Sequence, residues 1–409
     1  MLSWFWSGCI VLSFIACLVQ LFIFDNHDVF TDTTEALFNT AELSVEISIG
    51  LIGLMALWLG FFKIAERAGL ANAIANLLNP FFRKLMPELP DKHPAIASMT
   101  MNMGANALGL DNAATPFGIK AMHDLQSSNH SSDTLSNAQI LFLVLNTSSV
   151  TVLPVTVFLF RAQQGASHPT EVFIPILIAT YMSTIVGLLS VAYAQKINLL
   201  NKTIISYLVV FSSIPILLAI YFLQLPKEQM SHQAQLLANF VLFATVAFFI
   251  LAGWRKQISV YDAFIDGAKQ GFKTAIQLIP YLLAMLLAIA LLRASGLLAG
   301  FIAIISSGLH AIHIDTSFIE ALPTALMKPF SGSGARAAMI EVMHTQGADS
   351  FPAKVAAVMQ GSTETTFYVL AVYCGAVGIT KIRYAMTCSL LADAAGITTA
   401  VFISYAFFA

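Results

Sequence analysis

Charged residues are scarce in this sequence. Only 10% of its 409 residues are Asp, Glu, Lys or Arg, whereas soluble globular proteins contain about 25%. A water-soluble enzyme of this length would need far more polar surface. With 20 Lys and Arg against 22 Asp and Glu, the chain also lacks the basic excess that nucleic-acid binding requires. The composition therefore excludes a soluble enzyme, a disordered protein and a nucleic-acid-binding protein.

Cysteines are few, and no catalytic motif is present. The four cysteines lie in apolar runs without C-x-x-C or metal-ligand spacing, as expected for small buried side chains; they are Cys9, Cys17, Cys374 and Cys388. The sequence contains no H-E-x-x-H, no G-x-S-x-G and no Walker A loop. We therefore predict that the protein is not an enzyme, holds no cofactor and does not drive transport with ATP.

Apolar residues, in contrast, make up 57% of the chain, and the mean hydropathy is +0.78. A helix that crosses a bilayer needs about 20 mostly apolar residues, and we predict nine such spans. They are residues 4–24, 43–62, 138–160, 172–194, 204–223, 236–254, 275–293, 359–380 and 385–405. Because no Lys or Arg precedes the first run, it is interpreted as an uncleaved span. The predicted fold class is an all-α, polytopic membrane protein.

Two regions fit this template badly. Residues 68–120 and 295–350 mix short apolar runs with Gly, Pro, Asn, Ser and scattered charge. Such segments occur at membrane depth only where they are buried in protein or line a cavity. We therefore predict broken or re-entrant helices in both regions.

The chain also repeats itself. Arg67-Ala-Gly-Leu70 recurs as Arg293-Ala-Ser-Gly-Leu297, and the polar segment 146–151 recurs as 360–365. In both halves an apolar helix ends at the first motif, an irregular segment follows, and a final apolar span closes the unit. The sequence therefore predicts two copies of one structural unit.

The Lys and Arg residues of the loops predict opposite directions for the span 43–62 and its counterpart 275–293. The two copies are then inverted, which is typical of secondary transporters, whose solute site lies near the midplane between the halves. A symmetric scaffold without transport is the alternative. The predicted domains are a first span (1–29), a first repeat (30–203), a two-span linker (204–255) and a second repeat (256–409).

Polar side chains are concentrated in segment 101–116 of the first repeat. Asn102 and Asn106 are four residues apart and share a face if this segment is helical, while Asp111 and Asn112 either face the same cavity or cap a helix. Gly and Pro free backbone carbonyls, and Asn offers both donors and an acceptor. The segment can therefore bind an ion or a polar solute, or join neighbouring helices by hydrogen bonds.

Polar residues also recur at matched positions of the two halves, in the predicted spans 138–160 and 359–380. They are Asn146, Ser148 and Ser149 in the first half and Gln360, Ser362, Thr363 and Glu364 in the second. An ionisable group within a span is costly and is by default a functional candidate. Glu364 is therefore predicted to bind a cation or carry a proton, and the alternative is an ion pair with Lys328 or Arg336.

Two further features of the second repeat are candidates for the functional site. The glycine-rich run 328–336, which contains Ser331 and Ser333, can present backbone N–H groups to an anion or can allow close helix packing. Asp393 lies in the middle of the last apolar span, with no basic neighbour in its own helix. It either makes a helix–helix hydrogen bond in its protonated form or binds a coupling ion.

These polar motifs resemble a known family. The segment 102–122 (NMGANALGLDNAATPFGIKAM) is similar to the signature of spore maturation protein A, while 328–335 (KPFSGSGA) and 358–368 (VMQGSTETTFY) are similar to that of spore maturation protein B. Both signatures occur in this one chain, so its halves resemble the two proteins fused together. The family carries the Gate or nucleoside-recognition domain and is similar to the core of concentrative nucleoside transporters and to the membrane part of ferrous-iron transporters.

The resemblance implies ion-coupled movement of a solute across the cytoplasmic membrane. In concentrative transporters, the polar tips of re-entrant hairpins and unwound helices bind nucleoside and sodium. By motif position the counterparts of those residues are Asn102, Asn106, Asn146, Ser148, Ser331, Ser333, Gln360, Ser362 and Glu364.

Two functions from different classes follow. The first is a secondary transporter of a small polar solute, nucleoside-like or an organic anion, coupled to sodium or protons. The alternative is a membrane scaffold in an envelope, cell-wall or spore-maturation complex. The expected partners are the solute, the lipid bilayer and further copies of the chain, with the amphipathic stretches 35–46 and 258–272 as candidate contacts.

Overall fold

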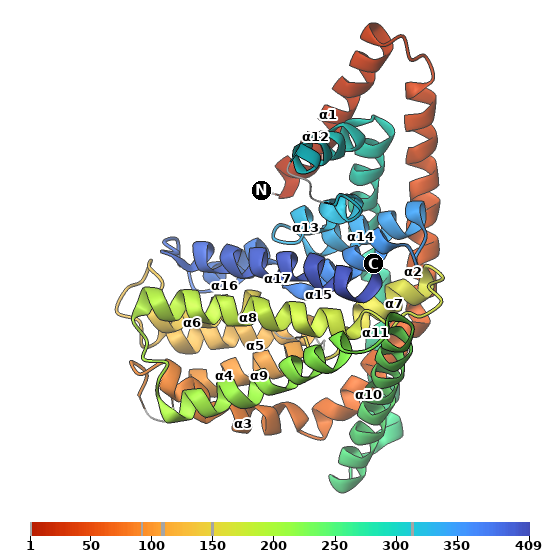
Figure 1. Ribbon diagram of the computed structural model, residues 1–409. Coiled ribbons are helices and arrows are strands. Elements are labelled where there is room, and N and C mark those ends of the chain that lie inside the picture. The colour runs from red at the N-terminus through yellow and green to blue at the C-terminus, as the bar shows by residue number, and fades with distance from the viewer. Residues whose placement is uncertain (1, 91–92, 108–110, 149–150, 312–314) are drawn as a thin grey trace.

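The computed structural model describes residues 2–90, 93–107, 111–148, 151–311 and 315–409 (Figure 1). In these residues the chain forms helices and no strand beyond one isolated bridge. The helices are α1 (Leu2–Ile23), α2 (Val29–Arg67), α3 (Leu70–Leu85), α4 (Pro94–Ala107), α5 (Asp111–Gln126), α6 (Asn137–Thr147), α7 (Val155–Gln163), α8 (Phe173–Gln195), α9 (Lys202–Leu223), α10 (Lys227–Arg255), α11 (Val260–Ala294), α12 (Leu297–Ala311), the short η1 (Ile319–Ala321), α13 (Leu322–Met327), α14 (Gly332–Gln346), α15 (Phe351–Ser362), α16 (Thr366–Ala376) and α17 (Ala385–Phe408).

The two halves contain the same series of helices. A long helix (α2 or α11) is followed by a shorter one (α3 or α12), then by a helical hairpin (α4–α5 or α13–α14), a broken helix (α6–α7 or α15–α16) and a long closing helix (α8 or α17). The structure thus confirms two repeats with broken or re-entrant helices. The sequence limits predicted for them, 30–203 and 256–409, stay predictions.

The repeated Arg-Ala-Gly and Arg-Ala-Ser-Gly motifs end the long helices for the same local reason. Gly69 has φ 76° at the junction of α2 and α3, and Gly296 has φ 71° at the junction of α11 and α12. Side chains disfavour this left-handed conformation, whereas glycine adopts it readily. Each glycine therefore lets the chain turn into a new helix at the equivalent point of its repeat.

Equivalent helices of the two repeats run antiparallel. Along α11, Gly267 lies against the carbonyl of Leu59 and Gly271 against that of Met55, so numbers that rise in α11 fall in α2. The closing helices α8 and α17 cross in the same way, with Gly187 next to Ala392 and Gly396 next to Ser183. Antiparallel equivalents confirm that the repeats are inverted.

The crossing of α2 and α11 depends on small residues, because the two backbones nearly touch. A Cβ atom at Gly267 would lie 2.2 Å from the carbonyl oxygen of Leu59, and a backbone atom cannot move aside as a side chain can. We expect Gly267→Ala to destabilise the protein by roughly 1–3 kcal/mol, as overpacking does. The measurement is thermal unfolding in detergent.

Gly53→Ala is the matched control, since Gly53 lies in α2 with nothing within 4 Å of the added methyl group. It should be neutral or slightly stabilising, because alanine favours helix over glycine. Equal losses in the two variants would contradict the close crossing.

The prediction of nine continuous spans is wrong. Within the described residues, six helices are long and apolar enough to cross a membrane, or seven if α11 and α12, bent by 69°, count as one broken span. The predicted spans 138–160 and 359–380 are each interrupted, at the breaks between α6 and α7 and between α15 and α16. Hydropathy averages over such short polar breaks, so it measures composition and not helix continuity.

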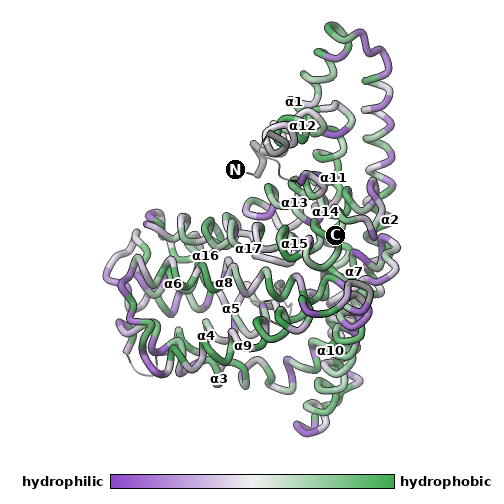
Figure 2. The backbone as a smooth tube through the Cα atoms, in the orientation of Figure 1, coloured by the Kyte–Doolittle hydropathy of each residue, from purple (hydrophilic) through white to green (hydrophobic). Residues whose placement is uncertain are grey.

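The helices form two groups. In Figure 1, α9, α8 and α17 run side by side, while the long helices α2, α10 and α11 cross one end of this group. Hydrophobic residues follow the helices, and hydrophilic residues gather mainly at helix ends and connections (Figure 2). The chain is therefore a multi-pass membrane protein whose polar exceptions lie at the helix breaks described next.

Candidate functional site

A cavity of about 340 Å³ lies between the two repeats, where their broken helices meet. Its walls come from the break between α6 and α7, the break between α15 and α16, the start of α14 and the hairpin α4–α5. The predicted site residues that line it are Asn106, Asn146, Ser331, Ser333, Gln360, Thr363 and Glu364. The inverted repeats therefore bring polar residues from both halves to one space.

The two breaks are joined directly. The backbone N–H of Glu364 donates to the carbonyl of Thr147 at 2.8 Å, and the Thr147 hydroxyl bonds the Ser389 hydroxyl at 2.9 Å. Where a helix stops, backbone groups lose their partners within the helix. Each break thus supplies part of the hydrogen bonding that the other requires, although the two lie more than 200 residues apart in the sequence.

Asn102 lies behind the cavity wall and orients two residues that form it. Its side chain is fully buried, and its Nδ2 donates to the carbonyl of Ala114 at 2.7 Å and to the Tyr373 hydroxyl at 3.2 Å. Its Oδ1 accepts a hydrogen bond from Asn146. Since Asn146 and Tyr373 both line the cavity, Asn102 is a positioning residue.

The start of α14 is fixed against the second break. Ser331 caps this helix by accepting the N–H of Gly334 at 3.0 Å, and the N–H of Phe367 donates to the carbonyl of Pro329 at 2.8 Å. The rings of Phe330 and Phe367 stack with centroids 4.8 Å apart. The glycine-rich run therefore forms one wall of the cavity rather than a free loop.

The remaining predicted residues lie elsewhere. Ser148 and Ser362 are buried and donate their hydroxyls to carbonyls of their own helices, at 2.8 Å each. Asp393 is 2% exposed, accepts the Thr366 hydroxyl at 2.6 Å and lies outside the cavity lining. Three predicted positions are outside the description: Ser149 altogether, and the side chains of Asp111 and Asn112.

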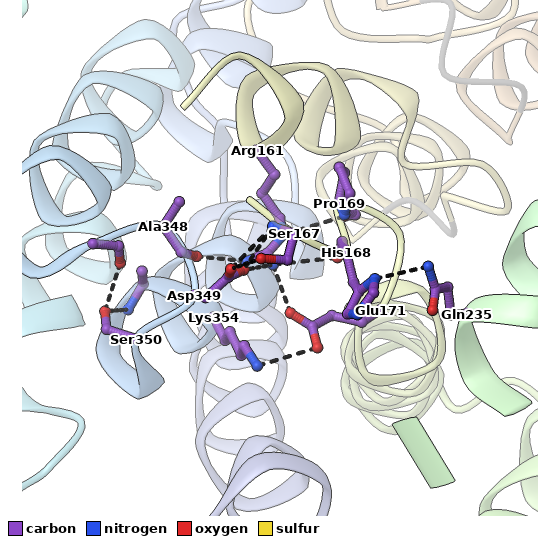
Figure 3. Close-up of polar contacts among 12 residues, drawn as sticks. Arg161, Ser167, His168, Pro169, Glu171, Gln235, Ala348, Asp349, Ser350 and Lys354 are labelled. Carbon is purple, nitrogen blue, oxygen red and sulfur yellow. Dashed lines mark hydrogen bonds and ion pairs between the residues drawn. The ribbon is translucent and has the colours of Figure 1, made fainter. Parts of the chain in front are cut away.

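A buried charge cluster that the sequence does not predict joins the two repeats (Figure 3). Arg161, at the end of α7, is fully buried; it bonds Glu171 at 2.7 Å and the carbonyl of Ala348 at 3.2 Å. Lys354 reaches the second oxygen of Glu171 at 3.1 Å. In sequence, Arg161 is only a basic residue after an apolar run, so its partners in the other repeat could not be foreseen.

Asp349 completes this contact between the repeats. It accepts the backbone N–H of Ser167 at 2.9 Å and the Ser167 hydroxyl at 2.7 Å, and it lies 3.6 Å from Arg161. Burial raises the pKa of Asp349, but the bonds from Ser167 and the charge of Arg161 outweigh it, so the pKa lies below its usual value. We call these residues, Arg161, Ser167, Glu171, Asp349 and Lys354, the Arg161 clasp.

The inverted repeat places an equivalent contact at the other end of the broken helices. The Arg161 clasp joins the α7–α8 loop to the α14–α15 region, and the corresponding partners are the α16–α17 loop and the α5–α6 loop. There Lys381 bonds Asp133 at 2.7 Å, and the backbone N–H of Lys381 donates to the Asp133 carbonyl at 2.9 Å. This second contact, the Asp133 clasp, has largely exposed side chains.

Acid should weaken the Asp133 clasp. Hydrogen bonds from Lys381, Thr134 and Ser131 lower the pKa of Asp133 from 3.8 to about 2. A carboxyl group with a depressed folded pKa stabilises the fold above its unfolded pKa, and this contribution is lost as the pH falls through the folded value. We therefore expect wild type to be more stable than Asp133→Asn above about pH 4, and this advantage to shrink toward pH 2.

Thermal unfolding of both proteins in detergent between pH 6 and pH 2 would measure this. Exposed pairs contribute little, so the informative quantity is the pH range over which the difference shrinks. A difference that stays constant down to pH 2 would contradict the role given to Asp133.

Comparison with known proteins agrees with the architecture. Residues 48–163 and 275–380, more than half of the chain, match the family described as Gate, nucleoside recognition. The chain is 40% identical to "Spore maturation protein A" of Bacillus subtilis (strain 168) over 154 residues, which cover 38% of the chain and 79% of that relative. It is also 40% identical to "Spore maturation protein B" of that strain over 158 residues, covering 39% and 87%. Each relative covers only part of the chain, consistent with a fusion, and no solved structure matches.

Proposed function

The chain belongs to the Gate nucleoside-recognition family, and from this premise we propose that it is a secondary transporter of a small polar solute in the cytoplasmic membrane. The proposal includes no enzymatic step. The solute binds in the cavity between the inverted repeats, and coupled ions, sodium or protons, drive its movement.

The observation that carries this proposal is the cavity itself. It lies where two broken helices from opposite repeats meet, and both breaks contribute polar groups to its walls. Non-helical backbone at membrane depth is tolerated where it lines a cavity, and transporters with inverted repeats bind their solutes at such breaks. A scaffold has no need for a polar space at this position.

Two acidic residues are candidates for the coupling ion. Glu364 lines the cavity, whereas Asp393 lies behind it, and the Asp393 Oδ1 has no hydrogen-bond partner among the described residues. A buried carboxylate oxygen without a donor is suited to a proton or a sodium ion, because either would satisfy it. We propose that binding at Asp393 is coupled to occupation of the cavity through Thr366, which bonds Asp393 at the start of α16.

Solute flux into proteoliposomes tests the proposal. Purified protein is reconstituted, sodium and proton gradients are imposed separately, and uptake of labelled nucleosides, organic acids and amino acids is measured. Asn146→Leu and Gln360→Leu remove polar groups from the cavity wall and should reduce uptake at least tenfold, as expected when a polar contact with the solute is lost. Gln224→Leu, an exposed position at the end of α9, is the matched control and should transport normally.

A second outcome would favour the alternative function, a membrane scaffold without transport. If none of these solutes is transported or bound, and the protein instead copurifies with an envelope protein whose binding survives Gln360→Leu, the chain is a scaffold and the transport proposal is wrong.

A further inference from the structure

The start of α14 gives the cavity a wall suited to negative charge. Lys328, Ser331, Gly332, Ser333 and Arg336 all line the cavity along this stretch. The first N–H groups of a helix have no partner within the helix, and the helix dipole adds partial positive charge there. Ser331 accepts the N–H of Gly334, which leaves the first-turn N–H groups of Gly332 and Ser333, two residues that line the cavity, as donors for an anion.

The side chains add to this positive end. The charged side chains that line the cavity are Lys328, Arg336 and Glu364, so the wall carries one positive charge in excess when a proton or a coupled ion neutralises Asp393 behind it. The Nε of Arg336 donates to the Gly332 carbonyl at 3.1 Å, so its guanidinium is held beside the first turn of α14. Lys328 is 4% exposed and also interacts with the charge of Asp393 behind the wall. Both cations are therefore fixed close to the same helix end.

A second and independent observation concerns hydrogen-bond acceptors. Gln360 and Thr363 line the cavity and are 8% and 4% exposed. The Gln360 Oε1 has no hydrogen-bond partner among the described residues, whereas the Thr363 hydroxyl faces the Asp393 carboxylate behind the wall. Buried polar atoms are rarely left unpaired, and an amide oxygen can only accept, so the Gln360 Oε1 calls for an N–H or O–H group of a ligand.

Together these walls define a solute class, and we propose that the solute is a small organic anion. Its carboxylate or phosphate group lies at the start of α14, between Lys328 and Arg336, and a hydroxyl or amino group on the same molecule donates to the Gln360 Oε1. This inference rests on the transport function proposed above and names the class of its solute.

Binding to the purified full-length protein, measured by calorimetry, tests the class with matched probes. Succinate and neutral succinamide have similar shapes and differ in charge, and L-malate adds a hydroxyl group to succinate. Uridine 5′-monophosphate and uridine differ by a phosphate, so this pair shows whether the bound anion is a phosphate and not a carboxylate. We expect at least one anion to bind at least tenfold tighter than its neutral counterpart, because the free energy of one charge-assisted hydrogen bond is enough for a tenfold change in affinity. L-malate, which carries the additional hydroxyl donor, should bind tighter than succinate if the anion is a carboxylate.

Variants of the cavity residues test which side chains bind the anion. Arg336→Gln should weaken anion binding roughly ten- to hundredfold and leave the neutral probes unchanged, and Arg336→Lys should restore part of the loss. Gln360→Leu should remove the preference for the hydroxylated anion. Lys256→Gln changes the same charge at an exposed position outside the cavity and should leave binding unchanged. If Arg336→Gln fails to fold, Lys328→Gln and the weakening of wild-type binding by salt provide the same test.

Two results would overturn the inference. If uridine or another neutral solute binds and is transported while Arg336→Gln and Lys328→Gln have no effect, the solute is not an anion and the transport function still stands. If no probe binds, and no labelled solute enters proteoliposomes, the inference and the proposed function both fail.

Discussion

Replacement of Arg161 with methionine is expected to destabilise the folded protein by roughly 3–5 kcal/mol, the effect of removing one partner from a buried ion pair. Arg161 is fully buried, and Glu171 is 3% exposed. Without the guanidinium, Lys354 is the one cation left beside Glu171 among the described residues, and the carbonyls of Pro169 and Ala348 lose this donor. Methionine fills much of the volume of arginine, so the loss reports on charge and hydrogen bonding more than on a void.

The chain provides both a readout and a matched control. The four free cysteines are buried, so a thiol-reactive dye reports unfolding in detergent. Arg67→Met removes an ion pair of the same length, 2.7 Å to Asp266, whose side chains are 40% and 47% exposed. Exposed pairs contribute about 1 kcal/mol or less, so this control should change stability little. Equal stability losses in the two variants would show that the Arg161 clasp is not a buried charge cluster.

Gly118→Ala is expected to reduce solute binding and transport at least tenfold and to destabilise the protein by roughly 1–3 kcal/mol, although Gly118 does not line the cavity. A Cβ atom at Gly118 would lie 2.2 Å from the Tyr373 hydroxyl, so the tyrosine must move. Tyr373 lines the cavity, bonds Asn102 at 3.2 Å and stacks on Phe142 with centroids 6.0 Å apart. Its displacement therefore changes the cavity wall and the hydrogen bonds of Asn102 together.

Gly375→Ala is the control for this prediction. Gly375 lies in α16, two residues from Tyr373, and an added methyl group meets nothing within 4 Å. Uptake and solute-dependent thermal stabilisation should be normal in this variant. Normal uptake by Gly118→Ala, at unchanged stability, would mean that the position of Tyr373 does not matter for the site.

Much of the fold could be predicted because its causes are local. Scarce charge and long apolar runs indicate a membrane protein, and the repeated glycine motifs at Gly69 and Gly296 mark equivalent helix ends. Polar residues that recur at matched positions, such as Asn146 and Gln360, indicated the site, because an inverted repeat brings equivalent breaks together near its axis. Their proposed roles in binding stay predictions.

What escaped prediction depends on contacts between distant segments. Neither the pairing of Arg161 with Glu171 nor its contact with Ala348 follows from periodicity or composition. The same holds for the bond between Glu364 and Thr147, because it joins two helix breaks whose distance is set by the packing of whole helices. Asn102 was predicted as a binding residue, but packing places it one layer behind the wall.

The two clasps have a consequence for the resting state of the protein. Perfect inverted symmetry would make the two ends of the broken helices equally easy to separate. Here one end is held by desolvated charges around Arg161, and the other by an exposed pair, Asp133 and Lys381, that salt and acid weaken. We therefore expect an unequal equilibrium in which the empty protein opens more readily on the Asp133 side. In the proposed transport cycle, the side on which the empty protein opens is then determined by a few loop residues and not by the fold, so we expect substitutions in those loops to reverse it without touching the cavity.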